Sequence, residues 1–191
     1  MRLTLNDMSL TSIDAINGVD ALCLFIGEDE RPLKGLAGYT DWRMCGALSG
    51  ILRSGYFAGT PGDCLLYPVV HGVSAQRVFF FGMGSRRQFR QESIGEALRT
   101  AMDVLQKAGC TSLALEIPGV TEANAGEVAT VFIENCLSRF SGSHVILIDA
   151  EAPAFSQALQ QSSDALKRLQ VTLDDQSRAL VRLKKSTARS G

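Results

Sequence analysis

Residues 19–26 read VDALCLFI, a nearly continuous apolar run that decides the fold class. Such a run is typical of a strand in a sheet that is covered on both faces, where either side of the strand meets the core. Shorter alternating or apolar segments along the chain have the same character. We therefore predict further strands at residues 2–5 (an edge strand), 64–70, 77–81, 111–117 and 144–148.

Helical patterns alternate with these strands. One helix is predicted to begin near Thr40 or Asp41, either of which can cap it, and to end at Gly55. Two more are predicted at 92–107 and 122–140, where apolar residues recur at helical spacing. Alternating strands and helices favour an α/β fold with three α/β/α layers and a mixed, largely parallel sheet.

The C-terminal part of the chain has a different pattern. Leucines recur there in a heptad-like seam, with neither a strand nor a helix breaker, which predicts a long C-terminal helix. We therefore divide the chain into an α/β domain at 1–152 and a helical extension at 153–191. A helix over 155–183 would be about 43 Å long, so its seam either packs on the domain or contacts another chain. The seam residues are Leu159, Leu166, Leu169, Leu173, Leu180 and Leu183.

Composition and charge narrow the classes of partner. The chain has 191 residues, 46% hydrophobic and 20% charged, with a formal net charge of -1. This balance provides no basic surface for nucleic acid, and no apolar run is long enough to cross a membrane. We expect a cytoplasmic protein that binds neither nucleic acid nor a membrane.

The five cysteines show no metal-ligand spacing. No two of them form a C-x-x-C pair, and Cys23, Cys45 and Cys136 lie within apolar runs. This pattern is typical of small buried side chains in a reducing compartment. We expect no metal and no cofactor.

Two segments carry a family resemblance. Residues 29–59 read DERPLKGLAGYTDWRMCGALSGILRSGYFAG, with a short exit at 55–59, and residues 77–84 read RVFFFGMG. Together with the order of elements over roughly 14–150, they resemble the N-terminal domain of the leucyl aminopeptidase family. The resemblance implies a macro-domain-like fold and a non-catalytic domain that takes part in oligomer assembly.

The chemistry of that family lies in a separate C-terminal domain with two metal ions, which this sequence does not contain. Asp149-Ala150-Glu151 echoes part of the family's metal-binding motif, but Ala152 and Pro153 follow it instead of glycine and arginine. Two-metal catalysis needs several converging carboxylates. We assign no catalytic residue and expect no enzymatic activity.

A glycine turn follows the predicted strand at 77–81. Its amides and arginines have the character of an anion site, and macro domains bind ADP-ribose through glycine-rich loops. The alternative is a sharp turn between strand and helix with solvated arginines, because no complete phosphate-loop signature is present. The candidate ligand residues are Gly82, Gly84, Ser85, Arg86 and Arg87.

Other polar positions favour structural roles. Asp41 is predicted to cap a helix and Trp42 to pack on the domain. The acidic segment 28–30 is predicted to be a solvated loop, and His71 and His144 to be ordinary residues at strand boundaries.

Two functions compete on this basis. The first is a non-catalytic domain that acts in protein interaction or oligomer assembly, as a homo-oligomer or with a protein partner. The alternative is a macro-type binder of ADP-ribose or a related nucleotide.

Overall fold

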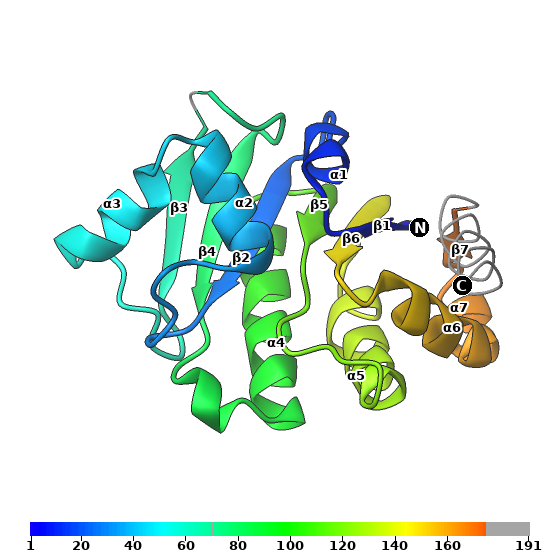
Figure 1. The fold of residues 1–191 in the computed structure, drawn as a ribbon. Helices are drawn as coiled ribbons and strands as arrows, with labels where there is room; N and C mark the ends of the chain where they lie inside the picture. Colours follow the sequence, from blue (N-terminus) through cyan, green and yellow to red (C-terminus); the bar gives the residue numbers. More distant parts are fainter. Residues whose placement is uncertain (70, 175–191) are drawn as a thin grey trace, which may run out of the picture.

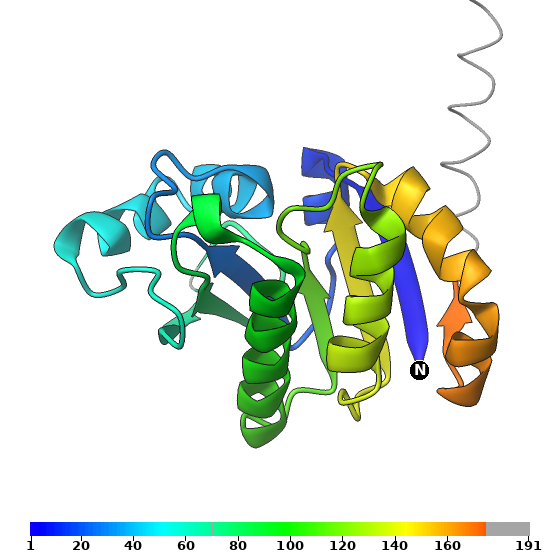
Figure 2. The ribbon, with the colours of Figure 1, turned by 90° about the horizontal axis from the view of Figure 1, so that it is seen from below.

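The computed structural model describes residues 1–69 and 71–174, which form a sheet between two layers of helices (Figures 1 and 2). The three-layer α/β arrangement predicted from the sequence is confirmed. The strands are β1 (Arg2–Asp7), β2 (Ala21–Ile26), β3 (Cys64–Pro68), β4 (Arg77–Gly82), β5 (Ser112–Leu115), β6 (His144–Asp149) and β7 (Thr172–Leu173). The helices are α1 (Leu10–Asp14), α2 (Gly35–Arg43), α3 (Ala47–Ser54), α4 (Gln91–Lys107), α5 (Ala125–Phe132), α6 (Ala152–Gln161) and α7 (Ser163–Arg168), with a 3₁₀ turn η1 (Arg86–Gln88) and a π-helical turn η2 (Ile133–Leu137).

The strands lie in the order β3-β4-β2-β5-β6-β1-β7. Among the described strands, only β3 runs antiparallel to its neighbour, and every other pair is parallel. The strand predicted at the edge, β1, instead lies between β6 and β7, so that prediction is wrong. The chain returns after α7 to add β7, which takes the edge position.

Side chains alternate between the two faces of the sheet, as the period of two in a strand requires. In β2, Cys23 and Phe25 join the core beneath α4, α5 and α6, whereas Leu22 and Leu24 join the core beneath α1, α2 and α3. All six residues of β2 are buried. The apolar run at residues 19–26 therefore contributes β2 to both cores of the molecule.

The helix predicted from residue 40 to Gly55 is two helices. The chain turns between α2 and α3, where Cys45 has φ 54° and Gly46 has φ 82°. Left-handed backbone ends an α-helix, and a cysteine at such a position gives no sign of it in the sequence. The turn also leaves Cys45 exposed, which corrects the prediction that it is buried, whereas Cys23 and Cys136 are buried as predicted.

Within residues 153–174, the predicted long C-terminal helix is not continuous. Helix α6 ends at Gln161, α7 ends at Arg168, and Gln170 with φ 54° leads into β7. Among the seam leucines, Leu159 and Leu166 are buried in the core, and Leu169 and Leu173 pack against it. These four leucines contact their own domain, while Leu180 and Leu183 lie outside the described residues.

The rings of Phe132 in α5 and Phe155 in α6 meet edge to face, with their centroids 5.8 Å apart. Helix α6 is therefore part of the layer that contains α4 and α5 (Figure 2). No helix in the described part of the chain is both long enough and apolar enough to span a membrane.

Candidate functional site at the carboxyl edge of the sheet

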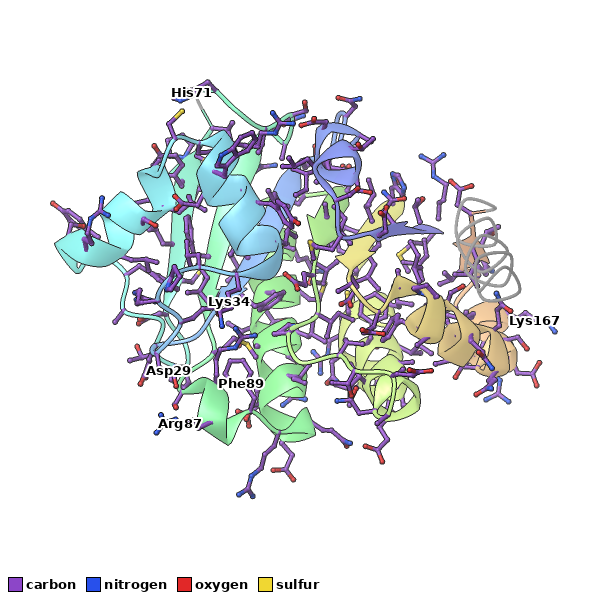
Figure 3. The ribbon with its side chains drawn as sticks, in the orientation of Figure 1. Asp29, Lys34, His71, Arg87, Phe89 and Lys167 are labelled. Atoms are coloured by element: carbon purple, nitrogen blue, oxygen red, sulfur yellow. The ribbon has the colours of Figure 1, made fainter. Side chains whose placement is uncertain are left out.

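Four parallel strands, β4, β2, β5 and β6, end at the same edge of the sheet. In open α/β sheets, loops at this edge form the usual ligand site. Figure 3 shows Asp29, Lys34, Arg87 and Phe89 around it, whereas His71 and Lys167 lie away from it. The edge therefore contains the glycine turn predicted from the sequence, together with acidic residues from the neighbouring loops.

The glycines of the turn allow two loops to pack closely. A Cβ on Gly82 would collide with the carbonyl of Thr60, and Gly84 has φ 72°, which favours glycine. The amide of Met83 donates to the Ile26 carbonyl at 3.0 Å and that of Gly84 to the Gly59 carbonyl at 2.8 Å. These two amides bind the protein's own backbone.

Asp29 occupies the next donors along the turn. Its carboxylate accepts hydrogen bonds from the Ser85 hydroxyl at 3.0 Å and from the Arg86 amide at 2.8 Å. The hydrogen bond from the Arg86 amide is the largest of the causes that lower the pKa of Asp29. The position where an external anion would bind therefore already holds a carboxylate of the chain.

The side chain of Arg86 is paired as well. Its guanidinium lies 3.1 Å from the carboxylate of Glu30, which is only 7% exposed and also accepts a hydrogen bond from the Gly27 amide at 3.3 Å. The prediction that 28–30 is a solvated loop is wrong for Glu30, because this ion pair holds it in the interior. Arg86 itself is 39% exposed, and Arg87 is exposed as well.

Two further carboxyl groups at this edge are not predicted from the sequence to be site residues. Glu116 follows β5, and burial raises its pKa to about 7. Asp149 ends β6, and burial raises its pKa to about 6. In the sequence, each of these two carboxyl groups lies at the end of an apolar strand, and this position is the signal that could have identified them. Asp149 itself was weighed in the sequence only as part of a metal-binding motif.

Each of these buried acids has a structural partner. Glu116 accepts a hydrogen bond from the Leu36 amide at 2.6 Å and so caps the start of α2, where Lys34 provides no side-chain cap. One oxygen of Asp149 accepts from the Glu151 amide at 2.8 Å, while its Oδ2 is buried without a hydrogen-bond partner. Within 1–69 and 71–174, no three or more His, Cys, Asp or Glu side chains are grouped so as to hold a metal ion.

A hollow of about 500 Å³ lies between the starts of α4 and α5, and none of the glycine-turn residues 82–87 is among its lining residues. Its volume is within the range of small-molecule sites. Acidic as well as basic side chains line it: the lining residues are Phe89, Arg90, Gln91, Glu92, Ile94, Gly119, Asn124, Glu127 and Val128.

The remaining sequence candidates lie elsewhere. Asp41 lies within α2 and binds the amide of Ser49 in α3 at 3.0 Å, so it helps to cap the second helix. Trp42 is 63% exposed, which corrects the prediction that it packs on the domain. Arg43 stacks over its ring at 5.1 Å and forms an ion pair with Asp14. His144 begins β6 and contacts the hydroxyl of Thr4 at 3.0 Å, as expected of a residue at a strand boundary.

The chain was compared with known proteins. A probable cytosol aminopeptidase of Methylobacillus flagellatus is 34% identical over 113 residues, which are 57% of this chain and 23% of that protein. A tomato leucine aminopeptidase mutant superposes with a TM-score of 0.57 at 14% identity, covering 83% of this chain and 35% of the other. The Oceanobacillus iheyensis macrodomain with ADP gives a TM-score of 0.58 at 9% identity, covering 76% and 85%.

These two structural similarities show the fold. The family itself is shown by sequence, because residues 21–140 match the model of the cytosol aminopeptidase family, N-terminal domain. The chain spans only 23% of the length of its Methylobacillus relative. Through this N-terminal domain, the chain belongs to the cytosol aminopeptidase family.

Proposed function

We propose that the chain is a non-catalytic domain that acts in protein interaction by assembling with copies of itself. The carrying observation is the distribution of exposed apolar side chains. The large hydrophobic residues that are exposed in the described part all fall within 39–66, on α2, at the end of α3 and on β3. They are Tyr39 (37% exposed), Trp42 (63%), Tyr56 (84%) and Leu66 (49%).

These elements lie together at one end of the molecule (Figure 1). A hollow of about 560 Å³ on α2 adds to this surface, and Leu10, Leu33, Tyr39 and Trp42 contribute its apolar lining. Clustered exposed apolar side chains on a folded domain are typical of interaction sites, and aromatic residues are enriched in such sites. A cytoplasmic location is part of this proposal and is supported by the relatives, which are described as cytosol aminopeptidases.

Light scattering on the full chain over a concentration series tests the proposal. We expect a mass that rises from one to at least two copies as the concentration increases. A mass of one copy at every concentration would overturn self-association. The contribution of Leu180 and Leu183 to such assembly stays a prediction.

A second candidate function is the binding of ADP-ribose or a related nucleotide. It is supported by the hollow of about 500 Å³ at the carboxyl edge and by the similarity in fold to a macrodomain described with ADP. The proposed ligand residues are Gly82, Gly84, Ser85, Arg86 and Arg87. Asp29 and Glu30 weigh against it, because their carboxylates already bind Ser85 and Arg86 and would repel a pyrophosphate.

The thermal stability of the chain with and without ADP-ribose separates the two candidates. A ligand present at about 100 times its dissociation constant stabilises the folded state by about 2.7 kcal/mol. We expect no shift in Tm at millimolar ADP-ribose. A shift that is lost in R86A and R87A would instead favour nucleotide binding.

A further inference from the structure

Strand β3 is one margin of the sheet. Its only neighbour among the described strands is β4, and β7 lies at the opposite margin (Figure 1). An edge strand presents a row of backbone donors and acceptors on which another strand can pair. The surface in question, here called the β3 edge, consists of the outward-facing backbone of Cys64, Leu66 and Pro68.

The hydrogen-bond pattern identifies those residues. The Gly82 amide donates to the Asp63 carbonyl at 2.9 Å, in line with the register that pairs Cys64 with Phe81. Hydrogen-bonded and non-hydrogen-bonded pairs alternate in an antiparallel ladder, so Leu65 and Tyr67 bond to β4. The backbone of Cys64 and Leu66 and the carbonyl of Pro68 therefore face outward.

Pro68 fits this position. Proline has no N–H, and it is tolerated in sheets where that group would point away from the neighbouring strand. Over the described ranges, no hydrogen bond is found from the outward amides of Cys64 and Leu66. The β3 edge is thus open along its length.

Among the side chains of β3, only Pro68 limits pairing at this edge, because it has no N–H to donate. Leu65 and Tyr67 pack against the core beneath α2 and α3, whereas Cys64, Leu66 and Pro68 are exposed. The strand reads CLLYP and has no lysine, arginine, aspartate or glutamate. Proteins commonly use charged side chains to prevent pairing at free edges, and β3 has none.

We propose that β3 pairs antiparallel with β3 of a second copy of this chain, around a twofold axis at Leu66. This inference rests on the proposed self-association and specifies its interface. Leu66 would exchange both backbone hydrogen bonds with the partner's Leu66. The Cys64 amide would donate to the partner's Pro68 carbonyl, and the Cys64 carbonyl would receive no bond in return because Pro68 has no N–H.

A second copy is the occupant that the β3 edge fits. The donor at one end of the strand meets the acceptor at the other end when the same strand is reversed. No charge is brought against a like charge, because the strand has no acidic or basic side chain. The twofold arrangement also closes the contact, since each edge is used once.

Sedimentation of the full chain with L66K provides the first test. A lysine at the centre of the pairing places two like charges opposite each other, so we expect the dissociation constant of the dimer to rise at least tenfold. E122K is the matched control, because Glu122 is exposed and lies outside both β3 and the exposed apolar residues at 39–66. It should leave the constant within about twofold of wild type, and both variants should keep the wild-type Tm within a few degrees.

Cross-linking provides a second test, in which the readout is the formation of a covalent dimer and not the loss of assembly. In a hydrogen-bonded antiparallel pair the Cα atoms lie about 5.5 Å apart, a distance that a disulfide spans. L66C in a C45S and C64S background should therefore form a covalent dimer on mild oxidation, while E122C in the same background should not.

These outcomes distinguish a failure of the proposed interface from a failure of the proposed self-association. If wild type assembles, but L66K assembles equally well and L66C does not cross-link, pairing through the β3 edge is wrong and self-association stands. If wild type is one copy at every concentration, both fail. Dimers that are lost in L66K and trapped by L66C support both.

Discussion

At the scale of single residues, Glu116 has a pKa well above the ordinary value of a glutamate, and nothing in the sequence indicates it. Its carboxylate caps α2 through the Leu36 amide, yet burial raises its pKa to about 7. Asp149 and Glu30 raise the same pKa, and Arg86 lowers it. Burial therefore outweighs the capping bond, and the ionised form of Glu116 destabilises the fold.

The pH dependence follows from the direction of this shift. The folded state holds the proton of Glu116 up to about pH 7, whereas the unfolded chain loses it near the ordinary value of 4.5. Stability from this group is present at low pH and falls as the pH rises between those two values. Relative to wild type, E116Q should gain about 1–3 kcal/mol more at pH 8 than at pH 5, measured by denaturant unfolding.

The surface variant E122Q is the control for this comparison. Glu122 is exposed, so its substitution should change stability equally at both pH values. An E116Q variant whose difference from wild type is the same at pH 5 and pH 8 would show that burial does not control this carboxyl group.

The glycine turn at 82–84 was evident in the sequence, but the residues that fill it were not. Glycines after a strand are a local signal. Asp29 and Glu30 come from a different loop, about 55 residues away, and only the parallel pairing of β2 and β4 brings them to the turn. Glu116 and Asp149 were missed for the same reason, because burial at the ends of β5 and β6 depends on helices that pack across the sheet.

At the scale of elements, the centre of the fold was predictable and its margins were not. The strands at 19–26 and 77–81 and the helix at 92–107 have a clear apolar period, and each is found close to its predicted bounds. The break between α2 and α3 depends on a left-handed Cys45, and the end of α7 on a left-handed Gln170. Neither residue type favours that conformation, so tertiary packing decides both turns.

The heptad-like leucines show how one pattern can serve two structures. Leu159 and Leu166 face the core from separate helices, and Leu173 packs against the core from a strand. Spacing by seven suits each of these local arrangements without a continuous helix. The sequence pattern therefore predicted burial well and the shape of the segment poorly.

The junction of β4 with the loop before β3 gives a prediction at this scale. A Cβ at position 82 would collide with the Thr60 carbonyl and with Gly59, both of which are backbone. G82A should therefore lower stability by about 2–4 kcal/mol, because neither group can move without displacing the loop. Thermal or denaturant unfolding measures the loss.

G126A is the matched control. Gly126 lies in α5 with nothing near its would-be Cβ, so alanine should stabilise the helix by about 0.5–1 kcal/mol. Equal stability of G82A and wild type would show that the loop at 59–60 accommodates a methyl group.

At the scale of the whole molecule, the segment after residue 152 is bound into the fold. Phe155, Leu159 and Leu166 are buried in the same core as α4 and α5. Large buried side chains contribute roughly 2–5 kcal/mol each when truncated to alanine, against a total stability of about 5–15 kcal/mol. We therefore expect the described parts of the chain on either side of the boundary at 152 to unfold together.

Truncation tests this directly. A chain that ends after Asp174 should unfold cooperatively with a Tm close to that of the full chain, whereas one that ends after Ala152 should lose its cooperative transition. Circular dichroism during heating distinguishes the two. Cooperative unfolding of the shorter chain at the wild-type Tm would mean that the domain is complete without α6, α7 and β7.

The position of β1 affects the order in which the strands of the sheet can pair during folding. The first strand lies between β6 and β7, and the ammonium group of Met1 donates to the Gln170 carbonyl at 3.0 Å. Strand β1 thus pairs with strands that follow it by more than a hundred residues in the chain. Contacts of such long range slow folding, so β1 needs protection from wrong partners until β6 and β7 have been made.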